Sequence, residues 1–327
     1  MHVLVGVYSE FASWNIPDAQ VERLRREFPR LVFTHARRAS DVGALVGDIE
    51  IAFVAELRPA HFAAAPRLRW IHSPTVGVGG LLFPALVESP VLLSNSRGLS
   101  SDPIAEHVLA LTMALFRKLP LAFRSQAARH WAQDEAIAAP PLRTVRASRV
   151  LIVGLGSIGA ACAWRFSALG AAVAAVRRRL DQPVPEGVRE VASLDRLHDL
   201  LPEADVVVIS AAQTGETRRL IGGAELAIMR RDAILINVSR GKLVDEGALA
   251  ESLRQGTLGG AGLDVFEHEP LDPGSPLWSL PNVIITPHMA GFRSDHWDAA
   301  TGFFAENLTR FERGQPLLNL VDKAAGY

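Results

Sequence analysis

The stretch VLIVGLGSIGAACAWRFSALGAAVAAVRRR, residues 150–179, decides the fold of this chain. An apolar run is followed by glycines at G-x-G-x-x-G spacing, then by helix-compatible residues and a second apolar run. This order predicts a strand, a tight turn, a helix and another strand, the unit that binds dinucleotides. We expect Gly154 to allow the turn, Gly156 to let the backbone approach a pyrophosphate, and Gly159 to let the helix lie close to the strand.

Two further features of this stretch concern the cofactor. The amides of Ser157 and Ile158 would face the pyrophosphate at the positive end of the helix. The position just past the second strand usually holds a carboxylate that binds the ribose hydroxyls, but here it holds Arg177, followed by Arg178 and Arg179. Because a guanidinium pairs with a 2′-phosphate, we predict that NADP(H) is preferred and NAD(H) is possible. A solvated basic turn is the alternative.

The composition is that of a globular protein. The 327 residues are 49% apolar and 21% charged with a formal net charge of −1, so nothing suggests a nucleic-acid partner. No apolar run reaches membrane-spanning length, and the N-terminal segment, with Glu10 and no basic region, indicates a strand and not a signal peptide. The single cysteine, Cys162, has no partner for a disulfide or a metal site, which indicates a core residue in a reducing cytoplasm.

Strand and helix patterns alternate along the rest of the chain, which predicts mostly parallel sheets. The first hundred residues are expected to form an α/β unit of their own. We expect strands at residues 2–7, 31–33, 49–54, 68–72, 205–209, 233–238, 259–265 and 282–286, helices at 17–28, 100–118, 121–131, 245–255 and 301–313, and a loop at 138–141.

Two features in the first part of the chain have more than one interpretation. The segment SPTVGVGGLLF, residues 73–83, directly follows a predicted strand, and its glycines expose amides that could hold a carboxylate. A plain turn fits these residues equally well. His107 lies in the mostly apolar helix expected at residues 100–118, where a structural or interface histidine is favoured over a catalytic one.

Three polar residues follow predicted strands of the nucleotide-binding part. Arg240, Glu269 and His288 each lie at or just beyond a strand's carboxyl end, the edge where a nicotinamide would arrive. Each has a simpler explanation: a surface charge for Arg240, a turn before proline for Glu269, and an ordinary loop histidine for His288. Together they supply an anion anchor, a carboxylate and a proton donor.

The chain resembles the D-isomer-specific 2-hydroxyacid dehydrogenases. That family carries GLGSIG-, NVSRGKLVDE-, GLDVFEHEPL- and PHMAG-like segments in the order found here, and the likeness extends to AEHVLAL at 105–111. The resemblance implies an α/β fold in which a Rossmann-like cofactor domain is inserted in a flavodoxin-like substrate-binding domain. The cofactor domain would span residues 101–289 and the substrate-binding domain residues 1–100 and 290–327. The resemblance also implies a homodimer with the long helix from Ser101 near the interface.

The resemblance assigns roles to individual residues. It makes His288 the acid/base, Glu269 its partner and Arg240 the substrate anchor in hydride transfer between NAD(P)H and a small 2-keto acid. Val76 and Gly77 match the loop whose amides hold the substrate carboxylate. Two further matches are expected cofactor contacts. Asp264 matches the residue that holds the nicotinamide amide, and Val238, in the segment NVSRG, is expected to bind the cofactor.

Departures from the family pattern keep other functions open. The family's loop often reads A-G-x-D, but residues 76–79 read VGVG, and residues 211–214 lack the proline common before the threonine. Arg177 replaces the usual acid, as in the NADP-using glyoxylate and hydroxypyruvate reductases of the family. Glu269 argues against the formate dehydrogenases, which carry glutamine there. A dinucleotide-binding corepressor and a phosphite dehydrogenase are the alternatives, since a fold alone never settles function.

Overall fold

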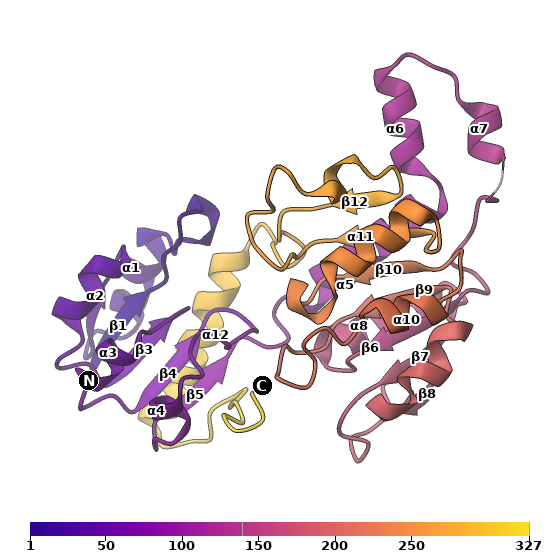
Figure 1. Ribbon diagram of the computed structural model, residues 1–327. Helices are drawn as coiled ribbons and strands as arrows, with labels where there is room; N and C mark the ends of the chain where they lie inside the picture. Colours follow the sequence, from indigo (N-terminus) through magenta and orange to yellow (C-terminus); the bar gives the residue numbers. More distant parts are fainter. Residues whose placement is uncertain (139, 327) are drawn as a thin grey trace. The chain divides into compact units, whose positions relative to one another are not determined.

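The protein is described by a computed structural model that covers residues 1–138 and 140–326. The chain divides into two compact units (Figure 1): unit 1 comprises Met1–Leu99 and Arg293–Tyr327, and unit 2 comprises Ser100–Phe292. Unit 2 is therefore inserted within unit 1 along the chain. The loop expected at residues 138–141 includes residue 139, which lies outside the described residues.

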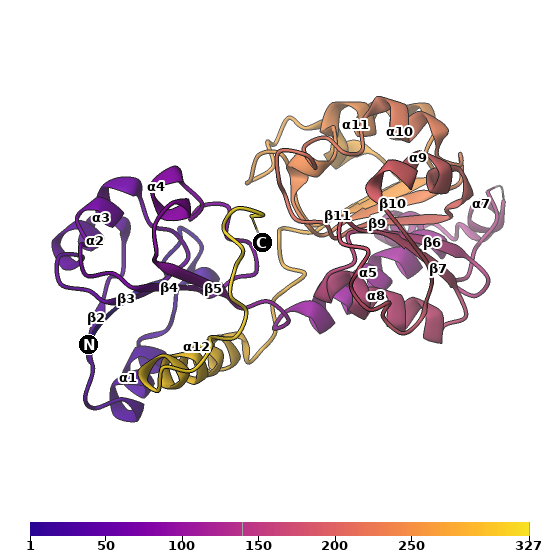
Figure 2. The same cartoon turned by 90° about the horizontal axis from the view of Figure 1, so that it is seen from below.

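Unit 1 is built on a parallel sheet with the strand order β2-β1-β3-β4-β5, the order of flavodoxin-like folds. Figure 2 shows α1 and α12 on one face of this sheet and α2, α3 and α4 on the other. The elements are β1 (His2–Gly6), α1 (Asp18–Glu27), β2 (Val32–His35), α2 (Ala39–Leu45), β3 (Ile51–Val54), α3 (Pro59–Ala63), β4 (Trp70–Ser73), α4 (Pro84–Val87), β5 (Leu92–Asn95) and α12 (His296–Glu312), with a 3-10 turn at Ala12–Trp14.

The last part of the chain completes the core of unit 1. Phe304 of α12 stacks on Phe53 of β3 with ring centroids 4.4 Å apart, and its ring lies 5.4 Å from that of Trp70. Further on, Leu320 forms an antiparallel bridge with Ser94 of β5. One face of the sheet is thus covered in part by α12, whose residues follow unit 2 in the sequence.

Unit 2 is built on a parallel sheet with the order β12-β11-β10-β9-β6-β7-β8. Read from β8, the first six strands follow the order 3-2-1-4-5-6 of dinucleotide-binding folds. The strands are β6 (Arg149–Val153), β7 (Ala172–Val176), β8 (Val188–Ala192), β9 (Val206–Ile209), β10 (Ile234–Asn237), β11 (Gly260–Leu263) and β12 (Val283–Ile285). The two sheets confirm the predicted α/β class.

Helices cover both faces of the second sheet. Figure 2 shows α5 and α8 on one face and α9, α10 and α11 on the other, and each face has its own buried apolar cluster. The helices are α5 (Ser101–Phe116), α6 (Leu119–Ala127), α7 (Gln133–Ile137), α8 (Ser157–Ala168), α9 (Leu197–Leu200), α10 (Gly223–Ile228) and α11 (Glu246–Gln255), with 3-10 turns at Leu194–Arg196, Leu201–Glu203, Gly241–Leu243 and Pro276–Ser279. No helix in the described part of the chain combines the length and apolarity that a membrane span requires.

Some elements differ from the sequence prediction. The last helix begins at His296, five residues before the expected 301. The strands β5 and β8 were not predicted, and the helix expected at 121–131 is the shorter α6, followed by α7. Figure 1 shows α6 and α7 extending away from the rest of unit 2. We call this pair of helices, with the residues between them, the arm. Phe123 in α6 is 63% exposed, and Trp131 between the two helices is 84% exposed.

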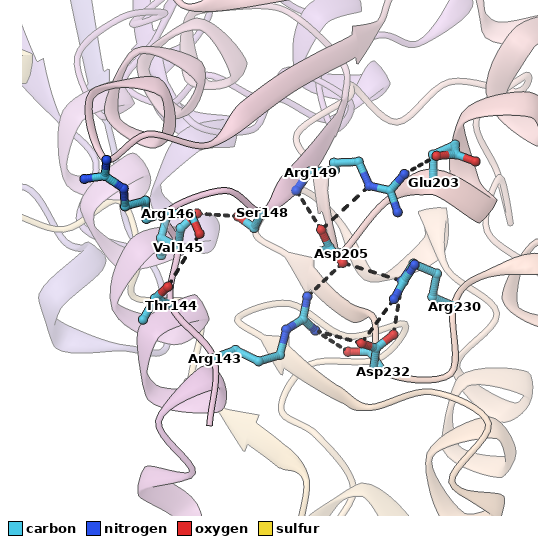
Figure 3. Close-up of polar contacts among 10 residues, drawn as sticks. All are labelled: Arg143, Thr144, Val145, Arg146, Ser148, Arg149, Glu203, Asp205, Arg230 and Asp232. Carbon is cyan, nitrogen blue, oxygen red and sulfur yellow. Dashed lines mark hydrogen bonds and ion pairs between the residues drawn. The ribbon is translucent and has the colours of Figure 1, made fainter. Parts of the chain in front are cut away.

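An ion-pair network lies at the amino ends of the strands of unit 2 (Figure 3). Asp205, just before β9, pairs with Arg143 at 2.9 Å and accepts the Arg149 amide at 2.7 Å. Arg230 contacts both Asp205 and Asp232, at 3.5 and 3.1 Å. The network ties the segment that follows the arm to the start of the sheet.

Candidate active site

The glycine loop between β6 and α8 has the geometry of a phosphate cradle. Gly154 has φ +99°, and a Cβ there would lie 2.4 Å from the Ala211 Cα. A Cβ on Gly159 would lie 2.3 Å from the Gly154 carbonyl oxygen, so glycine is required at both positions. At Gly156, the N-cap of α8, a Cβ would meet no described atom within 4 Å. The open space therefore lies where an anion can approach the first-turn amides of the helix.

Ser157 and Ile158 are the first two residues of α8. First-turn amides of a helix have no carbonyl partner four residues back, so they remain available as donors to an anion. The helix has 12 residues, and its dipole favours negative charge at this end. The residues of the loop therefore fit the pyrophosphate of a dinucleotide.

Arg177 follows β7 directly, as the sequence predicts. Its guanidinium donates to the carbonyl oxygens of Pro183, at 3.1 Å, and Gln182. Its Nε is buried and has no hydrogen-bond partner among the described residues. A buried donor without an acceptor is unfavourable by about 1–3 kcal/mol, so a phosphate oxygen at this place would be stabilising. Arg177 shapes the loop after β7 and still has donors for an anion.

The structure brings Arg240, Glu269 and His288 to one edge of the sheet of unit 2. They follow β10, β11 and β12, three adjacent parallel strands, at their carboxyl ends. The loops after β10 and β11 touch through their backbones: a Cβ on Gly241 would lie 1.8 Å from the Phe266 carbonyl carbon. Glycine at 241 thus allows the loop that carries Arg240 to lie against the loop that leads to Glu269.

His288 and Glu269 form a hydrogen-bonded pair, with 2.6 Å between Nδ1 and Oε2. The other carboxylate oxygen of Glu269 accepts the Phe266 amide at 3.0 Å. Burial alone would raise the pKa of Glu269, but the hydrogen bonds from His288 and Phe266 and the positive charges of His288 and Arg240 lower it. Because Nδ1 faces an ionised carboxylate, proton exchange with a ligand has to use Nε2.

Arg240 is partly buried and held by its own loop. Its Nη1 donates to the Ser239 carbonyl oxygen at 2.7 Å, and its carbonyl oxygen accepts the Asn237 side-chain amide at 3.1 Å. Burial lowers the pKa of Arg240, and the negative charge of Glu269 opposes that shift. A guanidinium remains charged at neutral pH even so, and therefore suits a carboxylate ligand.

Asp264 and Val238 are more enclosed than a role in direct cofactor binding suggests. Asp264 is 2% exposed, and its carboxylate accepts the Thr286 hydroxyl and the amides of Met289 and Ala290. The side chain of Val238 is buried in the core, so that only its backbone can meet a ligand. Sequence reasoning missed these contacts, since no local pattern links residue 264 to residues 286–290.

The loop with Val76 and Gly77 belongs to unit 1, and the carbonyl groups of both residues accept hydrogen bonds from side chains. The Val76 carbonyl accepts the Asn95 side-chain amide at 2.8 Å, and the Gly77 carbonyl accepts the Thr75 hydroxyl at 3.0 Å. A trans peptide group is planar, so the amides of Gly77 and Val78 point away from these two donors. Sequence reasoning missed Asn95, which lies in a short polar segment, residues 94–96, after an apolar run.

Comparisons with known proteins agree with this geometry. Residues 109–290 match the family described as D-isomer specific 2-hydroxyacid dehydrogenase, NAD binding domain. A glyoxylate reductase of Korarchaeum cryptofilum (strain OPF8) is 35% identical over 292 residues, which are 88% of this chain and 84% of the relative.

Two solved structures share the whole fold. A D-isomer specific 2-hydroxyacid dehydrogenase from Xanthobacter autotrophicus Py2, in complex with NADPH and MES, is 34% identical with a TM-score of 0.84, and 99% of each chain is covered. An NADPH-dependent glyoxylate/hydroxypyruvate reductase from Sinorhizobium meliloti, in complex with NADP and sulfate, is 28% identical with a TM-score of 0.84, and 100% of each chain is covered.

The fold, the glycine loop and these matches define an NAD(P)-dependent oxidoreductase. The chain belongs to the D-isomer specific 2-hydroxyacid dehydrogenase family.

Proposed function

We propose that the protein is an NADPH-preferring reductase of small 2-keto acids such as glyoxylate or hydroxypyruvate. One observation carries this proposal: the His288–Glu269 pair, 2.6 Å between donor and acceptor, lies at the same sheet edge as Arg240. This constellation supplies a proton, a carboxylate that orients the proton donor, and a cation for an anionic substrate. The relatives named glyoxylate reductases support the substrate class.

The cofactor would be held by residues of unit 2. Gly154, Gly156, Ser157, Ile158 and Gly159 would bind the pyrophosphate. Arg177 would bind the 2′-phosphate, which is why we propose NADP(H) over NAD(H). The backbone of Val238 and the carboxylate of Asp264 would lie at the nicotinamide end.

The bound nicotinamide supplies a hydride to the carbonyl carbon of the keto acid. Negative charge then grows on the carbonyl oxygen, and His288 donates its Nε2 proton to that oxygen while Glu269 holds Nδ1. Arg240 would stabilise the growing charge and anchor the substrate carboxylate. The family resemblance also gives the amides of Val76 and Gly77 a role in binding that carboxylate. The hydride and the proton together convert the carbonyl group to a CH–OH group.

The test is a panel of 2-keto acids assayed with NADPH and NADH by the loss of near-ultraviolet absorbance of the reduced cofactor. We expect turnover with glyoxylate or hydroxypyruvate and greater efficiency with NADPH. Dinucleotide binding without reduction of any keto acid would overturn the proposal and favour a corepressor. Reduction of NADP⁺ by phosphite in the same assay would favour the phosphite dehydrogenase alternative.

We also propose that the protein is a homodimer that buries the arm. The support is that three large apolar side chains of the arm, Phe123, Trp131 and Ile137, are each more than half exposed, and a second copy of the chain could bury them. Mass measurement by light scattering is expected to give twice the chain mass. Phe123→Glu combined with Trp131→Glu should lower it, and a monomeric unmodified protein would refute the dimer.

A further inference from the structure

His107 lies outside the catalytic trio but is connected to it. It belongs to α5 and is largely buried, with 17% of its side chain exposed. Its Nε2 lies 3.0 Å from the Thr286 hydroxyl oxygen, just past the end of β12. The contact joins residues that are 179 positions apart in the sequence, so no local pattern reveals it.

The hydrogen bonds determine which nitrogen of His107 carries a proton. The Thr286 hydroxyl has one proton, and it donates that proton to the Asp264 carboxylate at 2.6 Å. The hydroxyl oxygen can then only accept from His107, so Nε2 must be the protonated nitrogen. The result is a directed chain of donors from His107 through Thr286 to Asp264.

Asp264 in turn holds the backbone around His288. Its carboxylate accepts the amides of Met289 and Ala290 at 2.9 and 3.0 Å, and its carbonyl oxygen accepts the His288 amide at 2.9 Å. His288 has φ +50°, in the left-handed region that residues with side chains seldom adopt. Such a conformation persists only where the surroundings enforce it, and Asp264 supplies three of the enforcing contacts.

We propose that His107 and Thr286 are positioning residues for the proton donor, and that they act through Asp264. Without the His107 N–H, the Thr286 hydroxyl is free to turn away from Asp264, and the carboxylate loses a charge-assisted hydrogen bond. The loop at 287–291 then loosens, and His288 spends less time in the conformation that faces the substrate. This inference rests on the proposed function of His288, but its structural part can be tested without substrate.

Three variants test the inference. His107→Phe removes the donor, Thr286→Val removes the bridging hydroxyl, and His107→Gln places a side-chain amide donor at a comparable reach. The control is Thr112→Val on the same helix, which removes a fully buried hydroxyl whose hydrogen bond, among the described residues, goes to the Val108 carbonyl of α5 itself. Two quantities are measured: deuterium exchange of the amides at 288–290 in the protein without cofactor, and kcat with KM for keto acid and NADPH.

We expect His107→Phe and Thr286→Val to speed this exchange about tenfold, which corresponds to the loss of one hydrogen bond to a charged group. They should also lower kcat about three- to tenfold while both KM values stay within about twofold. His107→Gln should restore most of both, and Thr112→Val should resemble the unmodified protein.

Several outcomes overturn the inference. Exchange and kcat in His107→Phe and Thr286→Val equal to those of Thr112→Val would refute it, and so would His107→Gln behaving as badly as His107→Phe. If His107→Phe does not fold, the near-isosteric Thr286→Val decides alone. An unmodified protein that reduces no keto acid refutes the proposed function instead, and the exchange measurement still decides whether His107 positions the loop.

Discussion

The two edges of the sheet in unit 2 are both rich in charge, yet they are organised differently. At the amino edge, Arg143 is paired with Asp205 at 2.9 Å (Figure 3). The Arg143 guanidinium also lies over the Phe116 ring, 4.4 Å from its centroid. At the carboxyl edge, Arg240 bonds to the Ser239 carbonyl, and Glu269 acts on it only through its charge. An arginine that is paired with carboxylates stabilises the fold, whereas an arginine held by a backbone carbonyl keeps its charge for a ligand. Charge density alone therefore does not locate a site.

The largest expected effect is at His288, on the carboxyl edge. His288→Gln removes the proton donor but keeps a polar side chain, and turnover should fall about two to four orders of magnitude. Binding of NADPH, followed by its fluorescence, should change little, and so should the unfolding temperature. Turnover near that of the unmodified protein would remove His288 from the mechanism.

A matched pair of substitutions tests the comparison itself. Arg240→Lys and Arg143→Lys make the same change at opposite edges, keeping the charge and losing the forked geometry. Arg240→Lys should lower kcat/KM about ten- to a hundredfold, because Arg240 is proposed to bind both the substrate carboxylate and the developing alkoxide. The unfolding temperature should stay unchanged.

Arg143→Lys should lower stability and leave activity unchanged. Weaker contacts with Asp205 and Phe116 should destabilise unit 2 by about 1–2 kcal/mol, which lowers the unfolding temperature by a few degrees. The value of kcat/KM should not change. Equal losses of activity in the two variants would mean that the edges do not differ in function.

Cofactor preference is expected to change by a similar or smaller factor. Arg177→Asp should lower the ratio of kcat/KM with NADPH to that with NADH about ten- to a hundredfold, by removing the guanidinium and restoring a ribose-binding acid. The effect should shrink as salt is raised, because the contact is partly exposed. Arg189→Asp, the same charge change on an exposed position of β8, is the control. An unmodified protein that prefers NADH would refute the role of Arg177.

The smallest expected change is a shift of the pH profile. The lowered pKa of Glu269 keeps its carboxylate ionised through the neutral range, where it is hydrogen-bonded to His288. Glu269→Gln removes this negative charge beside the proposed proton donor. The alkaline limb of the pH profile for keto-acid reduction should therefore move down by about one pH unit. An unmoved limb would mean that Glu269 does not act on His288.

The carboxyl edge was largely predictable from the sequence, and the amino edge was not. Backbone geometry requires glycine at 154 and 159, and together with Gly156 they form the G-x-G-x-x-G spacing that predicts a dinucleotide-binding loop. Arg240, Glu269 and His288 were predicted to lie at one sheet edge because each follows an apolar strand, either directly or after a short loop. Arg143, Asp205 and Arg230 form no motif, since their pairing depends on which strands are neighbours.

Contacts across the chain account for the other misses. The first turn of α12 was not predicted because its apolar spacing is weak, and the Trp297 indole there donates to the Ser13 carbonyl of unit 1. His107 was found, but its connection to Thr286 requires α5 to lie next to β12. Local patterns predict which elements form, while these contacts depend on how the elements pack.

The interrupted unit 1 has a consequence for how the chain matures during synthesis. Phe304 and Leu320, which complete its core, emerge from the ribosome after all of unit 2. Unit 2 is continuous, so it can fold while the chain is still growing. Part of one apolar face of the unit 1 sheet must wait uncovered, because α1 packs on that face but α12 does not yet exist. Phe53 and Trp70 lack their contact with Phe304 until α12 arrives. Nascent chains that stop before residue 293 should therefore require chaperones more than released ones do.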